Sequence, residues 1–542
     1  MMHKILFLVF TLFITLKISA QSKGFELIKG MELMDLIHQN LELHYVDEPK
    51  PGKLCKVAID AMLKELDPYT VYYHEANMED YRMMTTGQYG GIGALIRKID
   101  NCIYISEPYE GNPAQKAGLK AGDKIITIDG KEMCNKPSDD VSSALKGPKG
   151  TTIQVKVLRE GKEITIPITR DEIKIPDVPY SGIIQNNIGY IKLNSFTQTA
   201  SEEVIKAFKV LKEKGMKELI LDLRGNGGGL LIEAVKIVNM FVPKDQLVVF
   251  TKGRIQEENK VYKTMDEPLD ITIPLVVLID DGSASASEIV SGSLQDLDRA
   301  VIIGTTSYGK GLVQRTFDLK YGSKMKLTIA KYYTPSGRCV QKLEYYEKAE
   351  GERPHAIADS LIKKFKTANG REVIDGRGIE PDLKIIEKEF SRLTAMLVNK
   401  NFIFKFATQY ANNHPNIPEA LTFKISNDDY EEFKKLVLKD TFDYSTASEE
   451  MLRKMRKTAE EEGYFEDSKL EYEALFKKLT PSKNSDLEKF KSEISNILEN
   501  EIVSRYYYQK GRTLHAFRTD NFVEKAKEIL QNSKEIHTIL KK

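Results

Sequence analysis

The chain of 542 residues has no tryptophan and only four cysteines, Cys55, Cys102, Cys134 and Cys339. It contains neither a Cys-x-x-Cys pair nor a His-Glu-x-x-His sequence. We therefore expect no metal site, and no other motif predicts a cofactor. Cys102 and Cys134 fall within one predicted domain and could pair, although four buried or free thiols are the simpler expectation.

An excess of charge is also missing. The chain has 80 Lys and Arg against 79 Asp and Glu, for a formal net charge of +1. This balance gives no electrostatic basis for binding nucleic acid or an anionic membrane surface. The length exceeds what a single hydrophobic core supports, so we expect two to four domains.

The N-terminus has the pattern of an export signal. Lys4 precedes an uncharged, mostly apolar run from Ile5 to Leu16, and Ala20 offers a cleavage site. The run is too short to span a bilayer comfortably and is typical of a secretory signal peptide over residues 1–20. Because Lys17 fits the cleavage pattern poorly, a retained N-terminal anchor is the alternative. Either way we expect an exported protein, in the periplasm or associated with the cell envelope.

The rest of the chain divides into four segments that differ in the spacing of their hydrophobic residues. Residues 24–85 have apolar side chains three and four apart, which predicts helices, and residues 86–169 contain short β-rich runs. Residues 170–185, rich in Pro and Asp, indicate a linker that opens an α/β segment extending to residue 388. Residues 389–542 are helical with alternating Glu and Lys, which indicates a largely solvated helical surface. A contact there with an adaptor protein or with a second copy is the alternative.

Two polar turns follow predicted strands in the α/β segment. Gly225–Gly229 follows the strand at 218–223, and Ser283–Ser287 follows the strand at 274–279. Alternating strands and helices predict a mainly parallel sheet with its ligands at the carboxyl ends of the strands. We therefore expect the two turns to meet at one edge of the sheet.

The serine-rich turn, Gly282-Ser-Ala-Ser-Ala-Ser-Glu288, has two interpretations. Small hydroxyl residues before a helix are typical N-caps. Together with Lys310, which lies between two glycines, they also suggest a Ser/Lys nucleophile pair. From the residues alone Ser283, Ser285 and Ser287 all compete for the nucleophile. Ser307-x-x-Lys310 is a rival arrangement, although the glycines beside Lys310 disfavour the helix that it needs.

A lysine base must lose its proton near neutral pH, and burial among apolar neighbours such as Leu312 and Val313 favours the neutral amine. If a strand begins at Lys310, Gln314 lies on the same face and could hold the amine. Backbone N–H groups would stabilise the oxyanion. The eight histidines lie mostly outside the α/β segment, so few of them are available as the base of a Ser/His/Asp triad.

A glycine-rich loop, Gly90-Gly-Ile-Gly-Ala94, opens the β-rich segment. Its N–H groups can converge on the carboxylate of a peptide C-terminus. With the sequence over residues 113–130, in which Ala-Gly-Leu-x-x-Gly-Asp-x-Ile occurs, the segment resembles a PDZ domain of the protease-associated type.

The motifs together resemble the carboxyl-terminal processing peptidases of family S41. The resemblance rests on the PDZ segment, Asp222-Leu-Arg-Gly-Asn-Gly-Gly-Gly229, the serine turn and Tyr308-Gly-Lys-Gly-Leu-Val-Gln314, with Leu66-Asp-Pro-Tyr-Thr70 and Gly378-Ile-Glu-Pro-Asp382 as flanking signatures. It covers roughly residues 25–388. It implies a multidomain α/β protein with N-terminal helices, an inserted PDZ domain, a crotonase-like Ser/Lys protease core over residues 170–388 and a helical C-terminal region.

The resemblance also implies the site residues. Ser285 is the nucleophile, Lys310 the general base and Gln314 the residue that orients the lysine. The N–H groups of Gly228 and Ala286 form the oxyanion hole, and the carboxylate of the captured tail binds the loop made of Gly91, Ile92, Gly93 and Ala94.

The resulting hypothesis is an exported serine endopeptidase that captures the C-terminal tails of proteins and cuts upstream of them. The resemblance further implies that the PDZ domain gates the active site. The alternative is a non-catalytic PDZ scaffold that binds peptides.

Overall fold

The computed structural model describes residues 24–541 apart from 76–77, 347–351, 387–388 and 443. The predicted signal peptide lies outside the described residues. The chain forms two compact units, one with residues up to 75 and 314–328, and the other with 76–313 and residues from 329 onward. Within the described ranges, no helix is both long and apolar enough to cross a membrane.

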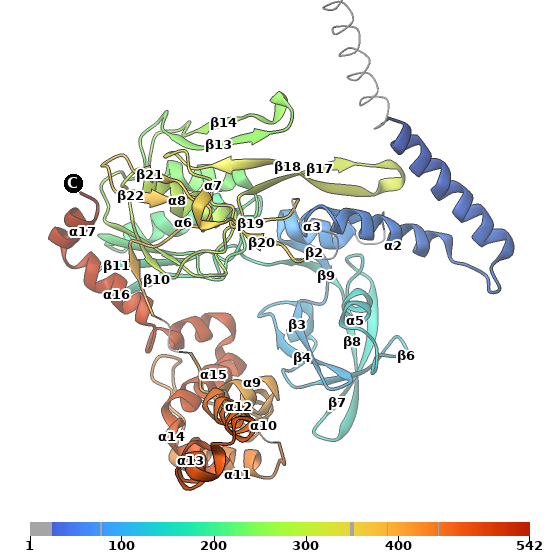
Figure 1. Ribbon diagram of the computed structural model, residues 1–542, viewed down its shortest axis with the longest axis vertical. Coiled ribbons are helices and arrows are strands. Elements are labelled where there is room, and N and C mark those ends of the chain that lie inside the picture. Colours follow the sequence, from blue (N-terminus) through green and yellow to red (C-terminus); the bar gives the residue numbers. More distant parts are fainter. Residues whose placement is uncertain (1–23, 76–77, 347–351, 387–388, 443, 542) are drawn as a thin grey trace, which may run out of the picture. The chain divides into compact units, whose positions relative to one another are not determined.

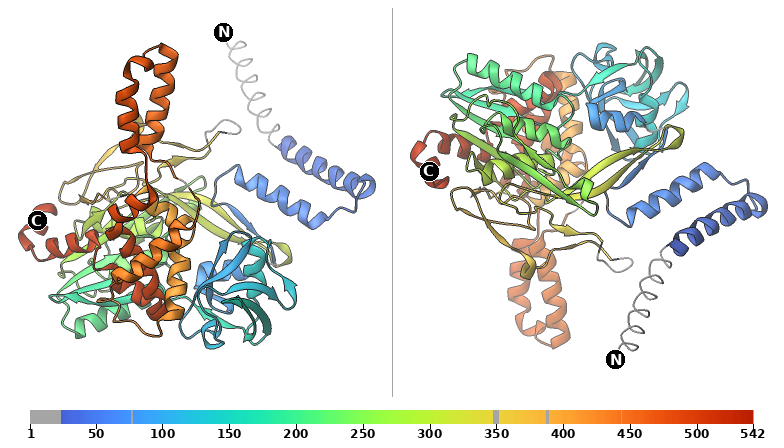
Figure 2. Two further views of the ribbon diagram at one scale, coloured as in Figure 1. Left: turned by 90° about the horizontal axis from the view of Figure 1, so that it is seen from below. Right: turned by 90° about the horizontal axis from the view of Figure 1, so that it is seen from above.

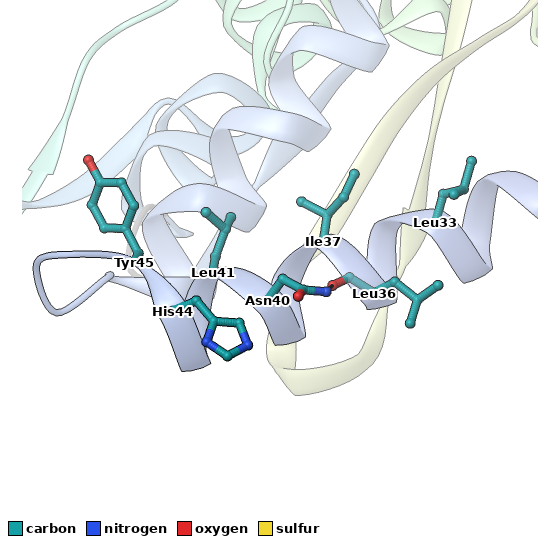
Figure 3. Close-up of a pocket in the computed structure, with 7 residues that line it drawn as sticks. All are labelled: Leu33, Leu36, Ile37, Asn40, Leu41, His44 and Tyr45. Carbon is teal, nitrogen blue, oxygen red and sulfur yellow. Dashed lines mark hydrogen bonds between the residues drawn. The ribbon is translucent and has the colours of Figure 1, made fainter.

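The described part of the smaller unit contains two helices, at residues 24–44 and at Pro51–Lys64 (α2). A short strand, β1 (Val71–Tyr73), pairs antiparallel with the start of β18 (Lys324–Tyr333). The first helix exposes most of its large apolar side chains. Several line a pocket along this helix (Figure 3), namely Leu33, Leu36, Ile37 and Leu41 with Asn40, His44 and Tyr45.

The PDZ segment is a β-rich domain (Figure 1). Its main sheet has the order β3–β4–β5–β7–β8, with strands Ala94–Ile99, Cys102–Pro108, Lys124–Ile128, Thr152–Arg159 and Lys162–Thr169. Alternate apolar residues, such as Ile103 and Ile105, are buried in one core with α5 (Ser138–Leu145). Period-two burial of this kind is what a sheet with one covered face requires.

A disulfide joins Cys102 and Cys134, whose Cα atoms are 4.4 Å apart. Cys102 begins β4, and Cys134 follows β6 (Lys131–Glu132), which pairs with β5, the neighbour of β4. The sheet therefore brings together two thiols that are 32 residues apart in the chain. The expectation of four unpaired cysteines is wrong for this pair, while Cys55 and Cys339 are free.

The core of the larger unit is a six-stranded sheet in the order β10–β11–β12–β15–β16–β23. The strands are Tyr180–Gln185, Ile188–Lys192, Glu218–Asp222, Leu275–Ile279, Val301–Gly304 and Leu383–Lys384. The pairs from β11 to β23 are parallel and only β10 is antiparallel, as the alternation of strands and helices predicted. Three helices bury one face, namely α6 (Ala200–Glu213), α7 (Leu231–Asn239) and α8 (Ala286–Asp296).

The predicted linker at residues 170–185 is wrong for most of its length. Asp171–Lys174 forms β9, which pairs antiparallel with β2 (Gln88–Gly91), and Tyr180–Gln185 forms β10 at the edge of the core sheet. Both strands pair with a neighbour on one side only. Prolines are tolerated near such edge strands, because fewer backbone N–H groups are required for pairing.

The described side chains of the C-terminal region pack into three hydrophobic clusters. The first cluster unites α9 (Arg392–Asn399), α10 (Phe402–Asn413), α11 (Asn427–Leu438), α14 (Lys483–Lys489) and α15 (Lys491–Ala516). Two further helices, α12 (Ala447–Glu462) and α13 (Phe465–Leu479), pack against each other as a hairpin (Figure 2).

The last helices belong to the core of the larger unit. Side chains of α16 (Asn521–Leu530) and α17 (Ser533–Ile539), such as Phe522 and Ile529, pack on the second face of the central sheet, against Ile220, Val276 and Leu278. This apolar face is buried, so the expectation of a largely solvated surface does not apply to these two helices. The core therefore has three layers, with helices on both faces of the sheet.

We predict that Ile529→Ala destabilises the core of the larger unit by about 2–5 kcal/mol, because it removes buried methyl groups and leaves a cavity. Ile529 is fully buried in this second layer. The neighbouring exposed Glu528→Ala is the matched control and should change the free energy of unfolding by about 0.5 kcal/mol or less. Urea denaturation measures both, and equal midpoints would contradict the three-layer arrangement.

Candidate active site

The structure brings the glycine turn and the serine turn together. They follow the adjacent parallel strands β12 and β15, in which Asp222 lies opposite Leu278. A Cβ atom added to Gly228 would lie 2.8 Å from the Cβ of Ser285 and 2.9 Å from the nitrogen of Ala286. Gly228 has φ = 97°, so both its backbone and this close approach require glycine.

Two of the three serines fasten the turns to each other. The Ser283 hydroxyl donates to the carbonyl of Leu223 at 2.9 Å, and the Ser287 hydroxyl donates to the carbonyl of Asn226 at 2.8 Å. Both side chains are completely buried, whereas Ser285 is only partly buried. Of the three candidates, Ser285 alone has the exposure that a nucleophile needs to reach a substrate.

Ser285 is also the N-cap residue of α8, so the two interpretations of this turn describe one position. Its backbone has φ = 55° and ψ = −111°, a sparsely populated conformation for a residue with a side chain. Such strain costs of the order of 1–3 kcal/mol and is concentrated at functional sites. In the first turn of α8, the N–H of Ala286 has no protein acceptor among the described residues.

The carboxylate of Glu288 joins the serine turn to the lysine loop. One oxygen accepts from the hydroxyl of Ser307 at 2.6 Å and from the N–H of Gly309 at 2.8 Å. The other accepts from the N–H of Ser285 at 2.8 Å and from the N–H of Lys310 at 2.9 Å. Complete burial raises the pKa of Glu288, and the four donors oppose that rise.

No role for Glu288 was predicted from the sequence, although a signal exists. Ser285-x-x-Glu288 has the spacing of a capping box, in which the acidic residue accepts from the N-cap N–H. That spacing explains the contact with Ser285. It does not indicate the three further donors, which come from 19 to 22 residues further along the chain.

The glycines beside Lys310 allow the lysine loop to approach a neighbouring segment. A Cβ on Gly309 would lie 2.5 Å from the Cβ of Lys342, and the N–H of Gly311 donates to the side chain of Gln341 at 2.7 Å. Residues 305–311 form no helix, so the rival helical pair of Ser307 with Lys310 does not exist. The Ser307 hydroxyl also accepts from the N–H of Ile379 at 2.7 Å.

Gln314 is anchored within the smaller unit, on β17 (Leu312–Asp318). Its amide donates to the hydroxyl of Thr328 at 3.1 Å, and Thr328 in turn donates its N–H to the hydroxyl of Thr70. Asp67 accepts from both the N–H and the hydroxyl of Thr70. A chain of hydrogen bonds through Thr70 and Thr328 thus connects the signature at residues 66–70 with Gln314. The pairing of Gln314 with Lys310 stays a prediction.

The two predicted oxyanion donors differ in their present partners. The N–H of Gly228 donates to the side-chain oxygen of Asn226 at 2.9 Å, whereas that of Ala286 has no such partner in the described part of the chain. Asn226 also donates from its amide to the carbonyl of Leu193. Gly228 must therefore exchange an internal hydrogen bond before it can serve an oxyanion.

The loop at residues 91–94 connects β2 and β3. The carbonyl of Ile92 accepts from Ala114 at 2.7 Å, and that of Gly93 accepts from Tyr109 at 2.9 Å. Gly93 has φ = 72°, and a Cβ there would lie 2.6 Å from the Cβ of Asn112. The loop is thus held through its carbonyl groups, and its shape depends on glycine at position 93.

The PDZ domain contacts α15 on another side. Glu107, at the end of β4, accepts from the amide of Gln509 at 3.0 Å and pairs with Arg512 at 3.3 Å. Burial raises the pKa of the Glu107 carboxyl, and Arg512 opposes the rise. Tyr508 interrupts the helical geometry of α15 at this point, and its hydroxyl accepts from Gln115 at 3.2 Å.

Comparison with known proteins gives three matching families. Residues 187–346 match peptidase family S41, residues 90–169 match the PDZ domain, and residues 393–530 match the probable PDZ-protease C-terminal helical domain. A probable CtpA-like serine protease of Staphylococcus haemolyticus is 31% identical over 419 residues, which cover 76% of this chain and 77% of that protein. The chain belongs to peptidase family S41.

The chain is also similar to two further proteins. A carboxy-terminal-processing protease of Bartonella bacilliformis is 39% identical over 311 residues, which cover 56% of this chain and 71% of that protein. A solved photosystem II D1 C-terminal processing protease is 26% identical, with 65% of this chain and 86% of that chain covered and a TM-score of 0.36. The resemblance read from the motifs and the predicted fold class are both confirmed. The S41 peptidase has N-terminal helices, a PDZ domain, an α/β core and a helical C-terminal domain.

We predict that Glu288→Gln lowers kcat/KM of the peptidase by about 10²-fold or more. An amide nitrogen cannot accept, so two of the four buried donors lose their partner, at about 1–3 kcal/mol each. Glu202→Gln, in the exposed first turn of α6, is the matched control. Cleavage of an unstructured protein measures the effect, with circular dichroism to verify folding. A folded variant with the wild-type rate would rule out this role.

Proposed function

We propose that the peptidase is an exported C-terminal processing endopeptidase with a Ser285–Lys310–Gln314 site. The supporting observation is that one buried carboxylate, Glu288, accepts from the backbones of both Ser285 and Lys310. Two loops that are distant in sequence are thereby fixed around a single group. The names of the relatives, as C-terminal processing and CtpA-like proteases, favour the same chemistry.

In this proposal the Ser285 hydroxyl attacks the carbonyl carbon of the scissile peptide, and the neutral amine of Lys310 takes the hydroxyl proton. The tetrahedral oxyanion accepts from the N–H groups of Ala286 and Gly228. Collapse breaks the C–N bond as Lys310 returns the proton to the leaving amine. Water then attacks the acyl-enzyme by the same route and frees Ser285. Gln314 orients the lysine.

The PDZ domain provides the module that binds peptide C-termini. We propose that the tail of a substrate protein binds at Gly91, Ile92, Gly93 and Ala94, where the turn between β2 and β3 offers backbone donors to the terminal carboxylate. Apolar residues of the tail would be favoured. The scissile bond then lies upstream of the captured end, and occupation of the PDZ domain would gate the active site.

Export and further partners are also part of the proposal. The disulfide between Cys102 and Cys134 supports export, because structural disulfides persist in oxidising compartments such as the periplasm. Contact with an adaptor or a second copy through the C-terminal helices stays a prediction. The exposed Met451 and Leu470, on the α12–α13 hairpin, are where such a contact would be sought.

We predict that Ser285→Ala abolishes cleavage of a tailed protein substrate, while tail binding remains. Ser307→Ala should retain reduced activity, because Ser307 contacts Glu288 but carries no chemistry. Peptide mapping after treatment with a serine-reactive phosphonate should place the label on Ser285, and wild-type activity should rise from pH 7 to 9 as Lys310 loses its proton. Undiminished cleavage by Ser285→Ala would refute the assignment. Tail binding by the wild type with no fragments would favour the scaffold.

A second prediction concerns tail capture. Gly93→Ala should weaken binding of an apolar C-terminal peptide by about tenfold or more, because the new Cβ meets Asn112 and the left-handed backbone disfavours a side chain. Gly130→Ala is the matched control, since it has a similar positive φ of 75° in open space within the same domain. Fluorescence anisotropy measures both affinities. Equal affinities of the two variants for the peptide would show that the tail does not bind at this loop.

A further inference from the structure

The glycine turn that carries Gly228 begins at Arg224, and this arginine lies between two carboxylates. Its guanidinium donates to Asp222 through Nε at 3.0 Å and Nη2 at 2.7 Å. It donates to Asp520 through Nη1 at 3.0 Å and Nη2 at 2.7 Å. The second pair is bidentate, with one guanidinium nitrogen on each carboxylate oxygen, which fixes orientation as well as distance.

This cluster is shielded from water. The exposed fractions of the side chains are 17% for Arg224, 1% for Asp222 and 12% for Asp520. The ring of Phe522 covers the guanidinium, with its centroid 4.8 Å from Cζ. Burial alone would raise the pKa of the Asp222 carboxyl, but Arg224 and Lys192 hold it below its usual range. Both pairs therefore act in a partly dry environment, where charge interactions are stronger than at an open surface.

The backbone of the turn is fixed at the same place. The N–H of Arg224 donates to Asp222 at 2.9 Å, and its carbonyl accepts from the amine of Lys192 at 2.6 Å. The next N–H, of Gly225, donates to Asp280 at 2.7 Å. The start of the glycine turn is therefore held at Arg224, four residues before Gly228.

Asp520 comes from a part of the chain outside the 187–346 range that matches family S41. It caps α16, where its side chain accepts from the N–H groups of Phe522 and Val523. Because α16 packs on the second face of the core sheet, the position of Asp520 is fixed by the hydrophobic layer below it. The helical domain thus supplies a carboxylate, held by its own fold, to the turn beside the nucleophile.

We propose that Asp520 is a positioning residue for the oxyanion hole. It holds the Arg224 guanidinium and thereby fixes the start of the glycine turn, which keeps Gly228 close to Ser285 so that its N–H can pass from Asn226 to the oxyanion of the tetrahedral intermediate. The inference rests on the oxyanion role of Gly228 in the proposed function. Without Asp520 the guanidinium keeps Asp222 but loses the partner of Nη1, and the start of the turn is held less firmly.

The two tasks of Asp520 can be separated by substitution. Asp520→Ser keeps a good N-cap but is too short to span to Arg224, and Asp520→Asn keeps the cap and the length but loses the charge. Glu524→Gln, three residues into α16 and exposed, is the control for a lost charge on the same helix. The readouts are kcat and KM on a tailed substrate, the Ki of a peptide boronic acid that forms a tetrahedral adduct with the active-site serine, and the urea midpoint.

For Asp520→Ser we expect kcat to fall about tenfold with KM within about twofold of wild type, less than the 10²-fold or more lost when an oxyanion donor is removed outright. The boronic acid Ki should rise by a similar factor and the urea midpoint should stay near wild type. Asp520→Asn should show a smaller change, and Glu524→Gln none. In an Arg224→Met background the effect of Asp520→Ser should disappear, because its partner is already gone.

If Asp520→Ser has the kcat and Ki of the wild type, this inference is overturned but the proposed function is not. The same holds for a kinetic loss that persists undiminished in the Arg224→Met background, or for one that appears only together with a lowered urea midpoint. Full cleavage by Ser285→Ala would instead overturn the proposed function, and this inference with it. The first set of results leaves Ser285 as the labelled nucleophile, so the two failures are distinguishable.

Discussion

The protease core depends on one buried carboxylate that four donors share. Glu288 lies in the first turn of α8, yet it accepts from Ser285, Ser307, Gly309 and Lys310. A carboxylate without water is costly unless each lone pair finds a donor, and here every donor comes from a loop that carries or flanks a reactive group. The same bonds that make the burial tolerable therefore define the geometry of the site.

The helical C-terminal region is integral to the α/β core rather than an appendage. Its last helices complete the second face of the sheet, and Asp520 contacts Arg224 at the start of the glycine turn. Only a few residues earlier, Arg512 and Gln509 contact Glu107 of the PDZ domain. One short stretch of chain thus contacts both the PDZ domain, which binds peptide C-termini, and the glycine turn next to Ser285, which gives the PDZ domain a physical connection to that turn.

Much of this arrangement could be predicted from the sequence, because the signals were local. The apolar runs located β12 and β15 to within one residue at each end, and parallel topology placed the glycine and serine turns at one edge. The misses have physical reasons. Edge strands such as β10 contain few distinguishing residues, and the spacing of Glu288 resembles an ordinary helix cap. Asp520 could not be found at all, since 296 residues separate it from Arg224 and only tertiary packing joins them.

The position of α16 and α17 in the chain has a consequence for how the enzyme comes into being. The strands that carry the catalytic turns lie between residues 188 and 304, whereas the helices that cover their second face begin at Asn521. A chain that is synthesised from its N-terminus therefore exposes an apolar sheet, and leaves Arg224 without Asp520, until α16 and α17 have emerged. The glycine turn therefore gains its second carboxylate partner only from a segment 296 residues further along the chain.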